Sequence, residues 1–136
     1  MNLKQLDKDI QELIKRRNEL QKIDYNNPKY DDLEEELHDG EDEFQEKYGE
    51  YLEGILQEIH DVHCPDSDVL MPIAYLAKKY SISGKGVYSV DSSEGVFVET
   101  EKFPGKDTKL VILPNPLRIV LNISKENQQV VWEGNK

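Results

Sequence analysis

The segment "LEGILQEIHDVHCP" (residues 52–65) decides how this chain of 136 residues folds. Its apolar residues recur at intervals of three and four, a spacing typical of one face of a helix. They are Leu52, Ile55, Leu56, Ile59 and Val62. The helix is predicted to end before Pro65, because a proline disfavours the helical conformation of the preceding residue. The fold therefore depends on which surface covers this apolar face.

The preceding residues predict two amphipathic helices joined by a short turn. Apolar residues at helical spacing indicate a first helix from Leu3 to near Asp24. "NNP" (residues 26–28) forms the turn, with Asn27 as a cap and Pro28 in the first position of a second helix. A short loop makes two helices antiparallel neighbours, so we expect a coiled-coil-like hairpin.

The second helix is predicted to extend beyond the first. The register places Ile10 opposite Phe44 and Gly40 beside Leu13. "HDGED" around Gly40 leaves a break open as an alternative, but the apolar spacing continues through it and favours a continuous or kinked helix. After Leu52 the second helix has no partner within the hairpin. Its apolar face must therefore pack against the second half of the chain.

The second half predicts a small sheet. Five segments have strand character: "GVYSV" (86–90), "GVFVETE" (95–101), "KLVIL" (109–113), "LRIVLNI" (117–123) and "QVVWE" (129–133). Short connections predict an antiparallel meander of four to five strands, in which "DSSE" joins the first two as a hairpin. A short helix is predicted from Pro72 to Tyr80, where apolar residues again have helical spacing.

The predicted fold class is therefore α+β. An antiparallel helical hairpin packs at one end on a β-meander of four to five strands with one short helix. Residues 1–64 form the acidic hairpin, which projects as an arm, and residues 65–136 form the sheet unit. We expect one cooperative domain, because the end of the second helix belongs to the core of the sheet unit.

Charge separates the two halves. Residues 1–64 hold eight Lys/Arg and nineteen Asp/Glu, whereas residues 65–136 hold nine of each, so the whole net charge of −11 lies in the hairpin. An acidic surface repels nucleic-acid phosphates, and we therefore expect no nucleic-acid partner. The same surface favours a basic protein partner, and self-association is a further expectation.

Location follows from what the sequence lacks. The sequence contains no run of about 18 apolar residues, so we expect no membrane-spanning helix. Its first residues do not have the pattern of a secretory signal. A single cysteine cannot form an internal disulfide. We therefore expect a cytoplasmic protein without a membrane partner.

A candidate metal site lies at the end of the second helix. His60, His63 and Cys64 share one face of the last helical turn, and Asp66 follows closely. Imidazole, thiolate and carboxylate groups are ligands for zinc and related divalent metals. The alternative is structural: histidines in the last turn bond free carbonyls and interact with the negative helix end, and the cysteine is a buried apolar residue.

These patterns lead to three functional hypotheses. The first is a non-enzymatic interaction or adaptor protein that uses its acidic helical arm, because no catalytic constellation stands out. The second is a metal-binding or metal-sensing protein that uses the histidine and cysteine cluster. The third is a small-molecule binder or enzyme with a site between the second helix and the sheet, lined by aromatic residues. These are Tyr48, Tyr51, Tyr75, Tyr80, Tyr88 and Trp132.

Overall fold

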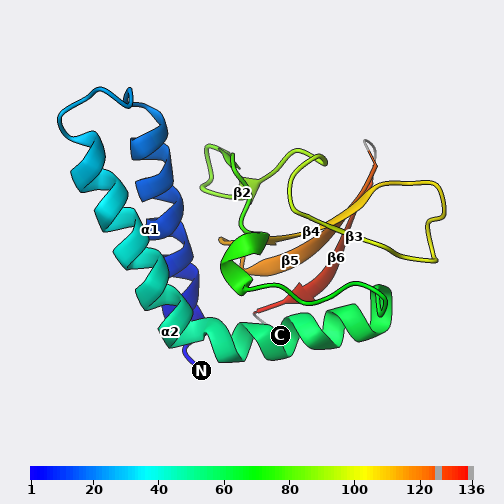
Figure 1. Ribbon diagram of the computed structural model, residues 1–136. Coiled ribbons are helices and arrows are strands. Elements are labelled where there is room, and N and C mark those ends of the chain that lie inside the picture. Colours follow the sequence, from blue (N-terminus) through cyan, green and yellow to red (C-terminus); the bar gives the residue numbers. More distant parts are fainter. Residues whose placement is uncertain (125–126, 135–136) are drawn as a thin grey trace.

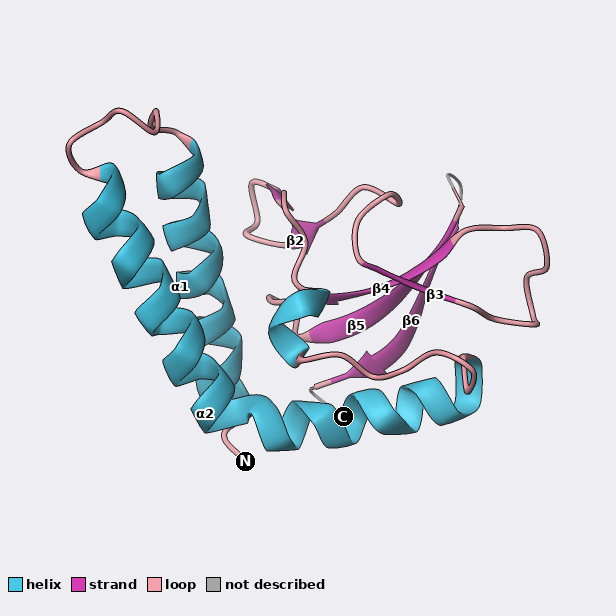
Figure 2. Ribbon diagram, in the orientation of Figure 1, coloured by secondary structure: helices cyan, strands magenta, loops and turns pink. Residues whose placement is uncertain are grey.

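The computed structural model describes residues 1–124 and 127–134 and confirms the α+β class (Figure 2). The helical elements are α1 (Leu3–Gln21), α2 (Tyr30–His63) and the 3₁₀ helix η1 (Pro72–Tyr75). The strands are β1 (Ser81–Ile82), β2 (Tyr88–Ser89), β3 (Val96–Val98), β4 (Thr108–Leu113), β5 (Arg118–Ile123) and β6 (Asn127–Glu133).

Helices α1 and α2 form the predicted hairpin. Helix α2 is continuous through Gly40, where an added Cβ would lie 3.4 Å from Cδ2 of Leu13, so the predicted proximity of these residues is confirmed. The predicted start of the helix is wrong, because α2 begins at Tyr30. Asn27 shapes the turn instead of capping the helix: its side chain accepts a hydrogen bond from the backbone N–H of Lys29, at 2.9 Å.

Helix α2 bends sharply partway along, so that its first part runs beside α1 and its second part runs along the sheet (Figure 1). Glycine weakens a helix locally, and sharp bends occur at such positions. The buried Gly49 leaves space that the amide of Gln45 occupies, and this amide reaches Glu53 at 3.4 Å. A Cβ at Gly49 would collide with that side chain.

Helix α1 also contacts the sheet half of the molecule. The backbone N–H of Asn115 donates to the Asp7 carboxylate at 3.0 Å, and Gln21 Nε2 donates to the carbonyl of Lys78 at 3.4 Å. These bonds join both ends of α1 to segments that lie far away in the sequence. The hairpin therefore lies along the second half of the chain as well as meeting it through α2.

The main sheet has the order β3-β4-β5-β6 and is antiparallel throughout. The predicted hairpin between residues 86–90 and 95–101 is wrong, because β2 pairs with β1 in a separate two-stranded sheet. Asn122 accounts for this difference: its side-chain amide donates to the carbonyls of Asp91 at 3.3 Å and Glu94 at 2.9 Å. These bonds hold the connection against the sheet face, away from a hairpin path.

The predicted helix from Pro72 to Tyr80 is also wrong. Only the four residues of η1 are helical, after which Leu76 forms a parallel bridge with Ile112 of β4. The hydroxyl of Tyr80 accepts from the backbone N–H of Ala77 at 2.9 Å and donates to the carbonyl of Ile112 at 2.7 Å. Bonds to the sheet thus replace the helical bonds that this segment would otherwise make.

Both faces of the sheet are covered. One face carries Leu110, Ile112, Ile119 and Leu121 in a single buried cluster with Leu56 and Ile59 of α2 and with the apolar residues of the hairpin. The other face carries Val111, Leu113 and Val120, which pack against Ala77. The apolar end of α2 is therefore buried as expected, except that Val62 is 64% exposed.

Candidate functional site: the acidic face of helix α2 and the groove beside it

Seven carboxylates form a continuous stripe along the surface of α2. Their spacing of three or four residues places them on one helix face. We call this set the acidic stripe: Asp31, Glu35, Asp39, Asp42, Glu46, Glu50 and Glu53. All seven side chains are exposed, and the face of α2 that carries Leu37, Phe44 and Tyr48 is buried.

No cation of the described residues (1–124 and 127–134) forms an ion pair with the acidic stripe. Arg17 binds Glu41, which lies outside the stripe, and Arg16 binds Glu12 of its own helix. Lys47, the one basic side chain among residues 31–59 apart from histidine, pairs with Asp9 at 3.5 Å. Each pair of like charges four residues apart destabilises a helix by about 0.2–0.5 kcal/mol. The repulsion along the stripe therefore lowers the stability of α2, and no ion pair among the described residues offsets it.

An apolar groove lies beside the acidic stripe, between the hairpin and the segment around η1. Met71 and Ile73 form its apolar side, and His38, Asp42 and Gln45 of α2 form the other, around a cavity of about 370 Å³. Asp42 thus belongs to both the stripe and the groove. Met71 is 55% exposed and the neighbouring Leu70 is 45% exposed, so this apolar side is open to solvent.

A second hollow, of about 490 Å³, is also lined by Ile73. Leu20, Leu37, Ala74 and Leu76 supply its apolar walls. The two hollows share Ile73 and run between three elements, α1, α2 and η1. The first hollow, with apolar side chains on one side and acidic groups on the other, is suited to a chain segment that carries both apolar and basic side chains.

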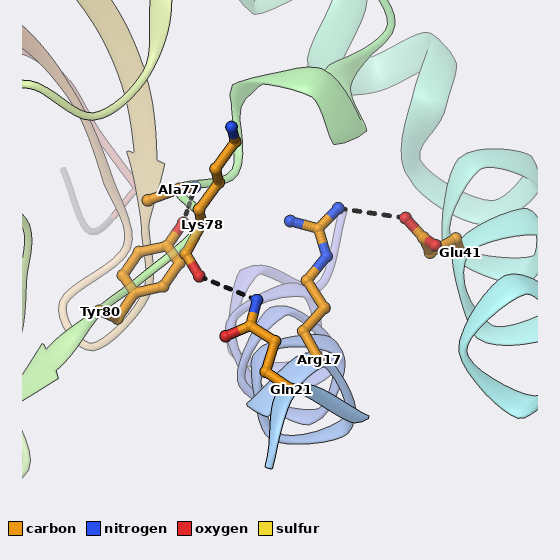
Figure 3. Close-up of polar contacts among 6 residues, drawn as sticks. All are labelled: Arg17, Gln21, Glu41, Ala77, Lys78 and Tyr80. Atoms are coloured by element: carbon orange, nitrogen blue, oxygen red, sulfur yellow. Dashed lines mark hydrogen bonds and ion pairs between the residues drawn. The ribbon is translucent and has the colours of Figure 1, made fainter. Parts of the chain in front are cut away.

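Polar contacts fix the walls of the second hollow (Figure 3). Arg17 and Gln21 lie one helical turn apart on α1 and extend toward different neighbours. Arg17 Nη2 donates to the Glu41 carboxylate of α2 at 3.1 Å, and Gln21 donates to the carbonyl of Lys78. Burial raises the pKa of Tyr80 well above its ordinary value, so this phenol stays protonated as a structural donor. Helix α1 therefore holds both walls in place.

A polar cluster joins the two helices of the hairpin. The Tyr48 hydroxyl donates to the Asp9 carboxylate, and the ammonium of Lys47 lies 5.2 Å from the centre of the Tyr48 ring. Burial acts to raise the pKa of Asp9, but hydrogen bonds from Tyr48 and Gln5 and the charge of Lys47 leave it lowered. The charged carboxylate of Asp9 thus stabilises the hairpin.

The structure gives His60 a role inside the protein. His60 is buried, with Nδ1 2.9 Å from the carbonyl of Ser67 and Nε2 3.0 Å from the hydroxyl of Tyr75. A carbonyl can only accept, so Nδ1 carries a proton, and in the neutral ring Nε2 then accepts from the Tyr75 hydroxyl. The Tyr75 oxygen in turn accepts from the backbone N–H of Leu70 at 3.0 Å. Both ring nitrogens are therefore occupied by protein groups.

The other three predicted metal ligands differ in their exposure and in their surroundings. Cys64 is buried, and burial raises the pKa of its thiol to about 11. His63 is half-buried, and burial and then the nearby charge of Lys102 lower its pKa. Asp66 is exposed. In the part of the chain that the structure describes, no group of three or more His, Cys, Asp or Glu side chains is arranged to hold a metal ion.

Most of the aromatic residues predicted around a small-molecule site lie in the core. Tyr48, Tyr75 and Tyr88 are buried, while Tyr51 and Trp132 are half-buried and pack against the same cluster. The sequence interpretation missed the groove residues Met71 and Ile73. A signal for them exists in "VLMPI" (69–73), an apolar run that begins before the predicted helix from Pro72 to Tyr80.

Comparisons of the chain with protein-family models, with curated proteins and with solved structures found no match. None of the helices in the described residues combines the length and the apolar character needed to cross a membrane.

Proposed function

We propose that this protein is a non-enzymatic interaction module that binds a basic protein through the acidic stripe of α2. The observation that carries the proposal is the stripe itself: seven exposed like charges on one face, without counter-cations among the described residues. Such a surface raises the encounter rate with a basic partner and destabilises the free helix. Binding would relieve the repulsion.

The apolar groove gives this proposal a second contact. Electrostatic attraction at an exposed surface contributes specificity and encounter rate more than affinity. Apolar side chains seated against Met71 and Ile73 would add buried area next to the charges. The proposed partner segment is therefore basic on one side and apolar on the other.

The chemically reactive side chains support binding over catalysis. Cys64 is held as a buried thiol, and a thiol is a far weaker nucleophile than a thiolate. Both nitrogens of His60 are engaged, and the Tyr80 hydroxyl both donates and accepts within the core. Each of these groups therefore serves the fold.

The proposed setting is the cytoplasm, with neither nucleic acid nor membrane as a partner. A buried, unpaired cysteine is compatible with a reducing compartment. The exposed carboxylates of α2 repel phosphate groups, whether of nucleic acids or of anionic lipids.

A charge-neutralised variant tests the proposal. The substitutions Glu35→Gln, Asp39→Asn, Asp42→Asn and Glu46→Gln remove four stripe charges and keep the side-chain shapes. The wild-type protein is cross-linked in cell extract, its basic partners are identified by mass spectrometry, and their affinity is measured with purified proteins. We expect the variant to lose affinity by about tenfold or more, and wild-type binding to weaken with salt.

A matched control changes the same net charge in the sheet half. Asp66→Asn, Asp68→Asn, Glu99→Gln and Glu101→Gln neutralise four exposed carboxylates outside the stripe. This control should keep the wild-type affinity. The free energy of unfolding of the stripe variant should also be higher than that of the wild type, by about 1 kcal/mol, because repulsion between like-charged neighbours is removed. Equal binding by all three proteins would disprove the proposal.

A further inference from the structure

Strand β6 forms one edge of the main sheet and is its longest strand. It pairs with β5 on one side, and in the order β3-β4-β5-β6 no strand of residues 1–124 or 127–134 lies on the other. In an antiparallel ladder, every second residue directs its backbone N–H and C=O away from the paired strand. Asn127, Gln128, Gln129 and Val130 are all exposed. This part of β6 therefore offers an accessible hydrogen-bonding edge.

Between residues 127 and 130, the edge lacks the features that usually block further pairing. Natural edge strands carry lysine, proline or inward-pointing charges that prevent two sheets from joining. From Asn127 to Trp132 the strand has no charged residue and no proline. A register shift opposite Ile119 and Val120 leaves an irregularity near Val131, but the residues from Asn127 to Val130 keep a regular register.

The chemistry of this edge matches a second copy of itself. Asn and Gln side chains carry both a donor and an acceptor, so identical amides can pair with one another. An antiparallel strand can also pair with its own copy across a twofold axis, where the same patch serves both subunits. The rest of the chain brings a net charge of −11, but two copies of Asn127–Trp132 meet without placing like charges together.

The opposite edge of the sheet is a less suitable surface. Strand β3 has only three residues, against seven in β6. It is flanked by Gly95, whose φ of +118° departs from an extended strand. Phe97 is 56% exposed on β3, and Val130 is 45% exposed on β6, so the two edges offer similar apolar residues for a controlled comparison.

We propose that two copies of this chain pair antiparallel along residues 127–130 of β6 and form a continuous eight-stranded sheet across a twofold axis. The interaction is independent of the acidic stripe and uses another face of the molecule. Its salt dependence has the opposite sign to binding of a basic partner. Salt screens the repulsion between two chains of charge −11, so dimerisation strengthens as salt rises.

Sedimentation equilibrium between about 10 µM and about 1 mM protein, at low and high salt, measures the dimer. Val130→Lys adds a charge of the kind that blocks edge pairing, and we expect it to weaken the dimer by about tenfold or more. Phe97→Lys makes the same charge change on the other edge and should stay within about twofold of the wild type. Circular dichroism checks that both variants fold.

Cysteine scanning is a second measurement of the strand pairing that does not depend on the lysine variants. Single Cys substitutions at 127, 128, 129 and 130 are oxidised in turn, and buried Cys64 serves as an inert background. Around a twofold axis, the position nearest the axis should form a disulfide-linked dimer, while a Lys106→Cys control should not. A monomer at every concentration, equal weakening by both lysine variants, or uniform cross-linking at all positions would overturn the proposal.

Discussion

Removing one oxygen atom at Tyr75 tests whether the histidine cluster serves the fold or a metal. In Tyr75→Phe the ring stays in the core, where Tyr75 is fully buried, but the hydroxyl is lost. Nε2 of His60 loses its donor, and the N–H of Leu70 loses its acceptor. An unpaired buried polar group costs about 1–3 kcal/mol. Leu70 is 45% exposed and His60 only 1%, so we expect the main cost to fall on His60.

We therefore expect Tyr75→Phe to lower the free energy of unfolding by about 2–3 kcal/mol. Urea denaturation followed by circular dichroism measures this change. The expected result is a lower midpoint with an unchanged slope. Tyr25→Phe is the control, because Tyr25 is 77% exposed, and it should leave the midpoint unchanged. A loss below about 0.5 kcal/mol for Tyr75→Phe would refute the assigned hydrogen bonds.

The same assay compares the structural role with the metal hypothesis. A ligand that binds only the folded state raises stability in proportion to the logarithm of its concentration. Because both nitrogens of His60 are occupied, we expect neither zinc nor a chelator to move the wild-type midpoint. If a chelator lowers the wild-type midpoint and zinc restores it, the cluster binds metal and the structural account is wrong.

Three further predictions concern single sites. Gly95→Ala should destabilise the protein by more than about 1 kcal/mol, since its φ is +118° and its Cβ would lie 2.5 Å from a carbonyl of β4. At Gly40 a new Cβ would collide with Nη1 of Arg16, which is the end of a flexible side chain that can move away. Gly40→Ala should therefore be neutral or stabilising in the same urea assay. Cys64, with its pKa raised to about 11 by burial, should react with iodoacetamide at pH 8 only after unfolding, as mass spectrometry would show. Because the pKa of Asp9 is lowered in the folded state, its charged carboxylate stabilises the fold at pH values above its ordinary pKa of 3.8. This stability is lost as the pH falls through the lower pKa of the folded state. Tyr48→Phe should reduce this acid dependence, and an unchanged pH profile would contradict it.

Periodic patterns explain the successful part of the sequence interpretation. The two helices of the hairpin follow from apolar residues at intervals of three and four, and Gly40 lies beside Leu13 as the predicted register requires. Strands β4 and β5 follow from their apolar composition and the short turn between them. These features depend on residues close together in the chain, and local spacing reports them directly.

Contacts between distant segments explain the rest. Residues 76–80 have helical spacing, but Leu76 pairs with β4 and Tyr80 binds the carbonyl of Ile112. The amide of Asn122 holds the connection at Asp91 and Glu94, so β2 and β3 do not form a hairpin. No local pattern encodes these bonds, because each partner is fixed only when the sheet has formed.

The features of the candidate site can likewise be separated into those that the sequence determines and those that depend on the tertiary structure. The sequence by itself determined that the acidic residues lie on one helix and that the end of this helix must be buried, because charge and apolar spacing are properties of the chain. Only the tertiary structure decided that the two ring nitrogens of His60 form hydrogen bonds with Ser67 and Tyr75. It also decided that Met71 and Ile73 line a groove beside the acidic stripe and that β6 is an edge strand of the main sheet. Those outcomes depend on which distant backbone groups meet, and the packing of α2 against the sheet settles that.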